Sequence, residues 1–529
     1  MRIKKQWSLA VCACLVVVLL AQTVYVSHEE SNPGSDRLIL DESPEGGYQG
    51  DYIVVLNGDY PDGRRLSTGF LNKLIETDIP ALKVGDNRAP DPNMYRSKAY
   101  RGEDPYAAKV ANGQMPEDNS WGVGAQRNFI VERTPASPDG KSIAFQVLAV
   151  GEHCRIWTPM NPDFYPLDAI DPTYAKQAAA EFDAQFPHTA RVFGDFLDVR
   201  GDGLVNILFY NIDGPIVSGL TSYYDFYEEV TISGKGYRGN AAPMIHIDTF
   251  GVAGIIRMDA EMEASHDITR CFPVMTHEFQ HLIYESKRYL DPDYRAYWHS
   301  QAQQSAYMNN LENEMWMTEF MSAAAGILRY PGMFRDDYVP YWYDNNANEA
   351  DVREHFSHHA EVLANKNYLT HRGRTIYQWK GQKDDYSLAA FLAQFAYVRG
   401  GEGVFQQIWA QWNDQRDKSG KPKPVQAVAD VLGYTDFADF HRDFVLSFLF
   451  HDAGSEGGRY RLYADRGDGV PDRMQEALSL LKPPLINGNE AKIEPGGFVV
   501  FKPIGGVYVP PITAMEGLTY IGVTVNNGE

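Results

Sequence analysis

The segment PVMTHEFQHLIY, residues 273–284, decides how this chain folds. Its apolar residues recur at helical spacing, which forms a stripe along one face, and its proline suits a first helical turn. Residues four apart lie on one face of a helix, one turn apart. We therefore predict a helix from Val274 to about Tyr289 that points His277 and His281 to the same side.

These two histidines and Glu278 form the pattern HExxH. Two imidazoles placed one helical turn apart reach one zinc ion at about 2.0–2.1 Å. The glutamate beside the first histidine then reaches the zinc-bound water and acts as general base. The plainer alternative is two surface histidines and a solvated carboxylate. The helical pattern around the motif favours the metal site, because the same letters on a strand would not bind a metal in this way.

A catalytic zinc needs three protein ligands and an open position. The extended pattern HExxHxxGxxH supplies a third histidine, but Tyr284 and Lys287 stand at its glycine and histidine positions here. The third ligand must therefore come from elsewhere in the chain. The segment ENEMWMTEFMSAAA, residues 312–325, is helical by pattern, and its small residues allow a second helix to approach closely.

Three glutamates in that segment are candidates for the third ligand. Glu319 is preferred, because Ala323 follows one turn later and leaves room beside the metal. Glu314 is the second choice, since it follows an asparagine as in the ligand helices of thermolysin-like enzymes, and Glu312 is the third. The candidates that do not bind metal are expected on a solvated helix face.

Hydrolysis of a peptide bond also needs a donor for the developing oxyanion. Tyr386 is the candidate, because it opens the apolar helical pattern of residues 386–398 well downstream of the motif. Packing is the alternative role for a single tyrosine. His299, His358 and His359 are weaker candidates for the same task.

The composition bounds the class of protein. At about 150 residues per domain, 529 residues predict about two to four domains. The net charge of −22 repels phosphate backbones, which argues against a nucleic-acid partner.

The first 27 residues are predicted to be a secretory signal. Basic residues at 2, 4 and 5 precede an apolar run from Leu9 to Leu20, and small or polar residues follow. The run is shorter than the roughly 20 residues of a membrane span. We expect an exported protein, secreted, periplasmic or on the cell surface, with no stable membrane span after cleavage. An uncleaved signal anchor is the alternative.

Two cysteines follow the signal. An oxidising compartment permits a disulfide between Cys154 and Cys271, and two buried free thiols are the alternative. Two segments with the letters RGDG, residues 198–206 and 465–472, hold closely spaced acidic residues that could bind Ca²⁺. Both break the full calcium-loop pattern, so tight turns are favoured there.

The pattern along the chain indicates an α+β fold. Residues 28–120 are rich in polar residues, Gly and Pro, and could include a pro-region; residues 121–455 form the catalytic domain, and residues 456–529 alternate like strands in a small β-rich domain. A helix is expected from Ala175 to Phe186, which Pro187 should end or kink. Strands are expected at 51–56, 128–132, 142–150, 205–212 and 243–250, and further helices at about 311–329, 386–399, 402–413 and 436–450.

Several segments together resemble a known family. HEFQHLIY (277–284) and WMTEFMSAAAG (316–326) are similar to the hyicolysin-type zinc metallopeptidases of bacteria, within the gluzincin clan. The likeness runs from roughly residue 121 to 450. The other stretches that carry it are GVGAQRNFIVE (122–132), FQVLAVGEHCRIW (145–157), FGDFLDVRGDGLVNILFYNIDG (193–214) and DDYSLAAFLAQFAYVRGGEGVFQQI (384–408).

The resemblance implies a zincin-like catalytic domain, with a small twisted sheet on the HExxH helix, a helical second lobe and the zinc in the cleft between them. It implies the zinc ligands His277, His281 and Glu319, the base Glu278, and hydrolysis of a protein or peptide substrate outside the cytoplasm. Thr318 stands where such motifs often have an asparagine. Two rival functions are a non-catalytic binding protein or adhesin on a peptidase scaffold and a zinc amidase that acts on a non-protein amide.

Overall fold

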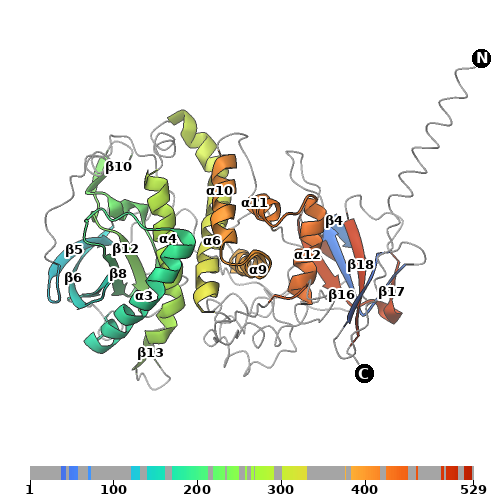
Figure 1. Cartoon of the computed structure of the whole chain (residues 1–529), viewed down its shortest axis with the longest axis horizontal. Coiled ribbons are helices and arrows are strands. Elements are labelled where there is room, and N and C mark those ends of the chain that lie inside the picture. Colours follow the sequence, from blue (N-terminus) through green and yellow to red (C-terminus); the bar gives the residue numbers. More distant parts are fainter. Residues whose placement is uncertain are drawn as a thin grey trace, which may run out of the picture.

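The computed structural model combines helices and sheets in one chain (Figure 1). Among the described residues, no helix has both the length and the apolar character that a bilayer crossing requires. The structure describes residues 37–42, 47–57, 69–72, 121–131, 140–160, 169–212, 218–232, 235–249, 256–258, 264–266, 268–290, 301–330, 376, 383–416, 424–450, 460–462, 490–493, 496–509 and 518–526.

A six-stranded mixed sheet forms one end of the molecule. Its three central strands run parallel and are buried throughout, as the apolar runs in their sequences predict. The outer strands are antiparallel to their neighbours, and β9 is the outermost described strand at one edge. The strands, in spatial order, are β5 (Gln126–Val131), β6 (Lys141–Val150), β7 (Cys154–Pro159), β8 (Val205–Tyr210), β12 (Met244–Asp248) and β9 (Gly219–Leu220).

Two helices cover one face of this sheet, α3 (Pro172–Phe193) and α4 (Phe272–Leu290). Ile207 and Ile245 from the sheet share one apolar core with both helices, whereas Trp157 lies in a separate core on the opposite face. Alternation along buried strands therefore divides the sheet into a helix-covered face and a second packed face.

Helix α3 corrects one expectation. Asp171 caps its first turn by accepting hydrogen bonds from two backbone N–H groups, and Pro172 occupies the first position. Pro187 does not end the helix, which continues to Phe193. Packing explains the continuation, because Phe186, just before the proline, stacks on Phe279 of α4 and the turns on both sides of it are buried.

Helix α6 (Gln301–Arg329) crosses α4 and joins the sheet region to a helical region. Its apolar residues, including Phe320, continue the same core through α9 to α12. The predicted helices of this half are confirmed, with α11 in addition. The helical region comprises α9 (Lys383–Gly400), α10 (Val404–Arg416), α11 (Pro424–Val431) and α12 (Phe437–Leu449).

A second sheet joins the two ends of the chain. Its strand order is β1 (Arg37–Asp41), β18 (Leu518–Asn526), β3 (Tyr52–Asn57) and β16 (Phe498–Phe501), all antiparallel. Strand β3 lies between two C-terminal strands, so this sheet unites parts of the segments 28–120 and 456–529. Two further antiparallel pairs of short strands also join the N-terminal segment to the C-terminal segment. They are β4 (Gly69–Asn72) with β15 (Glu490–Ile493) and β2 (Tyr48–Gln49) with β17 (Val507–Tyr508).

The apolar run of β3 explains its central place. Val54 and Leu56 face the main core, which also contains residues of α12, while Ile53 and Val55 face a smaller core on the other side. Phe448 of α12 packs against Phe498 of β16 and links the helical region to this sheet. The remaining elements among the described residues are two antiparallel strand pairs and three short 3₁₀ helices. The pairs are β10 (Glu229–Ile232) with β11 (Lys235–Arg238) and β13 (Ile256–Met258) with β14 (Ala264–His266), and the 3₁₀ helices are η2 (Tyr223–Phe226), η3 (Ile268–Cys271) and η7 (Ile504–Gly506).

Cys154 and Cys271 are both buried, and no disulfide joins them. Cys154 lies in β7 against Ala179 of α3, and Cys271 donates to the carbonyl of Ile268 at 3.0 Å. Burial raises the pKa of Cys154 above its ordinary value, with the nearby Asp183 carboxylate acting in the same direction. Of the two alternatives predicted for these residues, the disulfide is not formed and the two buried thiols are confirmed.

Candidate metal centre

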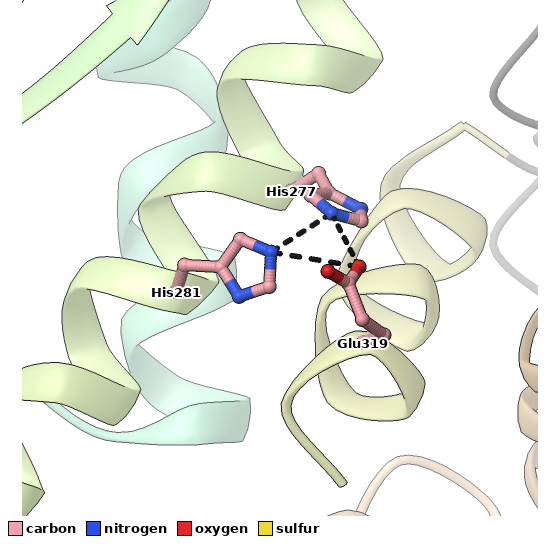
Figure 2. Close-up of side chains that lie close together, drawn as sticks. All are labelled: His277, His281 and Glu319. Atoms are coloured by element: carbon pink, nitrogen blue, oxygen red, sulfur yellow. Dashed lines mark hydrogen bonds and ion pairs between the residues drawn. The ribbon is translucent and has the colours of Figure 1, made fainter. Parts of the chain in front are cut away.

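Helices α4 and α6 bring together three side chains of the types that can bind a metal ion. His277 and His281 project from successive turns of α4, as their spacing predicts, and Glu319 approaches from α6 (Figure 2). The two Nε2 atoms lie 3.0 Å apart. Glu319 Oε2 lies 3.2 Å from His277 Nε2 and 3.6 Å from His281 Nε2. Within the described part of the chain, this is the group of His, Cys, Asp or Glu side chains that could hold a metal ion.

The separations fit a single bound cation. Ligand atoms about 2.0–2.1 Å from a tetrahedral metal lie about 3.3 Å from one another. The three distances of 3.0, 3.2 and 3.6 Å bracket that value. Two imidazole nitrogens and one carboxylate oxygen leave one tetrahedral position for water or a substrate, which is the donor set of an open metal site.

The charge at the centre also suits a cation. Glu319 Oε2 is buried, and no hydrogen bond of good geometry reaches it. Burial alone would raise the pKa of Glu319, but the close imidazoles of His281 and His277 outweigh burial and hold that pKa well below its ordinary value. The carboxyl group is therefore ionised, which is the form that binds a metal.

Thr318 orients one of the two imidazoles. Its Oγ1 lies 3.0 Å from His281 Nδ1. With the Nδ1 proton donated to this oxygen, the lone pair of Nε2 is left to face the centre of the group.

Glu278 lies outside the group of three and faces strand β9. Its side chain is buried, and Thr221 Oγ1 lies 3.2 Å from its Oε2 and 3.0 Å from its backbone carbonyl. Gly219, two residues earlier, lies directly against the Glu278 side chain. The carboxylate thus lies against the edge strand of the six-stranded sheet.

The other glutamates of α6 have separate outcomes. Glu314 is not part of the group of three, but the solvated helix face expected for such a glutamate is wrong. It is buried and accepts a hydrogen bond of 2.7 Å from the Tyr284 hydroxyl of α4, so it joins the two helices. The side chain of Glu312 lies outside the described residues, as does that of Tyr386, although Tyr386 falls within α9. The remaining candidates outside the described residues are His299, His358, His359 and the acidic segment 465–472.

The acidic segment 198–206 forms a tight turn. Asp198 accepts hydrogen bonds from the backbone N–H groups of residues 200, 201 and 203. Asp202 Oδ2 pairs with Arg155 at 2.9 Å and with Arg200 at 3.1 Å. Hydrogen-bond donors and cationic groups occupy these oxygens, as the turn favoured over a calcium loop predicts.

Sequence reasoning did not find Thr221, Gly219 or the role of Thr318. Thr221 precedes Glu278 by 57 residues and belongs to no motif, so its contact arises only from the fold. Thr318 carried a signal, because it adjoins the predicted ligand Glu319. No protein-family model matches the chain, and no curated protein shows significant similarity to it.

Proposed function

We propose that the chain is an exported, zinc-dependent peptidase with a zincin-like catalytic domain. The observation that carries the proposal is the convergence of His277, His281 and Glu319 within 3.6 Å of one another, with Glu278 adjacent on the same helix. Imidazole and carboxylate donors with an open position are typical of catalytic zinc. The resemblance to hyicolysin-type metallopeptidases supports the same assignment, and the apolar N-terminal run supports export.

His277, His281 and Glu319 would hold the zinc. When bound, zinc supplies an acidified water and polarises the carbonyl of the scissile bond. Glu278 accepts the proton from the attacking water and delivers it to the leaving amine nitrogen. Thr318 holds the ring of His281 in the orientation that presents Nε2.

Strand β9 supports a peptide as the substrate. It pairs with β12 on one side, and no described strand pairs with its other edge. An extended peptide can add to such an edge through main-chain hydrogen bonds. Because Gly219 of β9 touches Glu278, a peptide added there would run beside the proposed general base.

The first test measures the metal content of the purified full chain after reconstitution with zinc. Wild type and Glu314→Ala should each bind about one zinc per chain, whereas Glu319→Ala should bind much less, as a single three-ligand site predicts. Glu314→Ala is the matched control, because it removes a buried glutamate from the same helix without removing a ligand.

The second test measures hydrolysis. Zinc-loaded wild type should cleave a fluorescein-labelled, unfolded protein, and Glu278→Gln should keep its zinc but lose turnover. Full activity of Glu278→Gln would refute the base assignment. One zinc per chain without any hydrolysis would favour the binding protein, and cleavage restricted to peptide-free amides would favour the amidase.

A further inference from the structure

The end of β9 touches Glu278 at two separate points. The Thr221 hydroxyl has one proton to donate, and both the carbonyl oxygen and Oε2 of Glu278 lie within 3.2 Å of it. Thr221 and Glu278 are both nearly inaccessible to solvent, with 5% and 2% of their surfaces exposed. A buried carboxylate that accepts such a bond is restrained more firmly than an exposed one, because little water competes for its oxygens.

The second contact is a close approach at Gly219. A Cβ atom at this position would lie 2.8 Å from Glu278 Cγ and 2.9 Å from Val274 Cγ1. The same Cβ would lie 3.0 Å from Glu278 Oε1. These distances are shorter than van der Waals contact, so any larger residue would displace the Glu278 side chain or separate β9 from α4.

The two carboxylate oxygens of Glu278 have different neighbours. Oε2 lies beside the Thr221 hydroxyl, whereas Oε1 lies over the backbone of Gly219. The terminal torsion of a glutamate is broad, so the side chain alone does not fix which oxygen faces a given direction. Alternate residues of a strand share a face, so Gly219 and Thr221 reach the same side chain together.

We propose that Thr221 and Gly219 are positioning residues for the general base, an inference that rests on the proposed function. Thr221 anchors Oε2 and Gly219 provides the space that the side chain needs, so that together they hold the carboxylate in one pose. Strand β9, which would bind an extended substrate at its edge, therefore also fixes the position of the general base Glu278. In the alternative, a purely structural role, these contacts would only hold β9 against α4.

The experiment compares Thr221→Val, Thr221→Ser and Gly219→Ala with wild type, all as zinc-loaded full chains. Thr221→Val keeps the shape of the side chain and removes the donor. It should lower kcat by about 10- to 100-fold, the cost of a small misplacement of a reacting group. KM should change by less than about threefold and zinc content should stay at one per chain, because Thr221 does not contact the metal-binding group. Thr221→Ser should restore most of kcat.

Thr189→Val is the matched control. It removes a buried threonine hydroxyl that donates to the Gln185 carbonyl within α3, outside the proposed catalytic group. If Thr221→Val lowers kcat no more than Thr189→Val does, the inference is wrong. Gly219→Ala should also lower kcat, and Thr221→Val keeps the test decisive if the alanine variant does not fold.

A measurement independent of activity separates this inference from the proposed function. Thr221→Val and Glu278→Ala are combined in a double-mutant cycle on the melting temperature of zinc-loaded protein. The hydrogen bond between the side chains predicts shifts that are not additive. Additive shifts with unchanged kcat in an active enzyme would overturn the inference alone. Non-additive shifts in a zinc-loaded protein that hydrolyses nothing would instead overturn the peptidase and reduce the contact to a structural one.

Discussion

Thr318 offers the sharpest test of how the metal centre is built. Its hydroxyl oxygen lies 3.0 Å from His281 Nδ1. Thr318 is buried, with 7% of its surface exposed. Thr318→Val preserves the volume of the side chain but leaves the imidazole N–H without this acceptor. An unsatisfied buried donor costs about 1–3 kcal/mol. Loss of a partner that orients a metal ligand lowers metal affinity by about 10- to 100-fold, or about 1.4–2.8 kcal/mol, which is the same range.

The assay is competition for zinc against a fluorescent chelator at fixed pH and ionic strength. Thr318→Val should weaken binding by that factor while its apo form stays folded. Thr318→Ser and Thr318→Asn should bind nearly as wild type, because each can place an oxygen near the imidazole. Ser322→Ala is the control, because Ser322 lies one turn further along α6 and its hydroxyl donates to the backbone carbonyls of Thr318 and Glu319 and not to an imidazole. Equal zinc affinities of Thr318→Val and Ser322→Ala would refute the reasoning.

Three further outcomes are expected. Tyr284→Phe removes the 2.7 Å bond to the buried Glu314 and should destabilise the protein by about 1–3 kcal/mol in denaturant titrations without changing the zinc stoichiometry; an unchanged midpoint would contradict it. Burial lowers the pKa of His441 to about 4, against a smaller opposing contact with the Gly496 backbone. The unfolded state therefore binds more protons than the folded state between about pH 4 and 6.5. The free energy of unfolding should fall by up to roughly 3 kcal/mol as pH falls through that window, and chelator-treated His441→Leu should lose this dependence. Removal of residues 1–57 deletes the buried apolar run of β3, worth roughly 6–12 kcal/mol at 1.5–3 kcal/mol per side chain, so mass spectrometry of the folded protein should find an N-terminus before Tyr52.

The group of His277, His281 and Glu319, which could hold a metal ion, was predictable because its chemistry is local. His277 and His281 are fixed relative to each other by one turn of helix, and the apolar stripe of α4 shows which side of that helix is buried. Glu319 required one further step, the expectation that a helix with small residues would cross α4 closely. The structure confirms that the two helices pack together, and Ala324 and Ala325 of α6 are buried in the main core.

The supporting contacts were not predictable, because they join segments that are remote in the sequence. Thr221 meets Glu278 only when β9 pairs antiparallel with β12 at the sheet edge, and β9 has only two residues. Such a short strand shows no periodicity. Pro187 was predicted to end or kink a helix from its local effect alone. The helix does not end there, because the aromatic contact of Phe186 with Phe279 supplies packing that propensity does not include.

The terminal sheet shows the same limit on a larger scale. The apolar run of β3 indicates a strand buried on both faces, yet its partners begin more than 400 residues later, at Phe498 and Leu518. A run of this kind cannot remain at the end of a chain without covering, because both of its faces would expose apolar side chains to water. The need for two covering partners was therefore present in residues 52–57, and only their identity required the fold. Because α12 supplies one of the covers and packs on α9, the ends of the chain are tied to the helical region that supports α6 and, through it, Glu319.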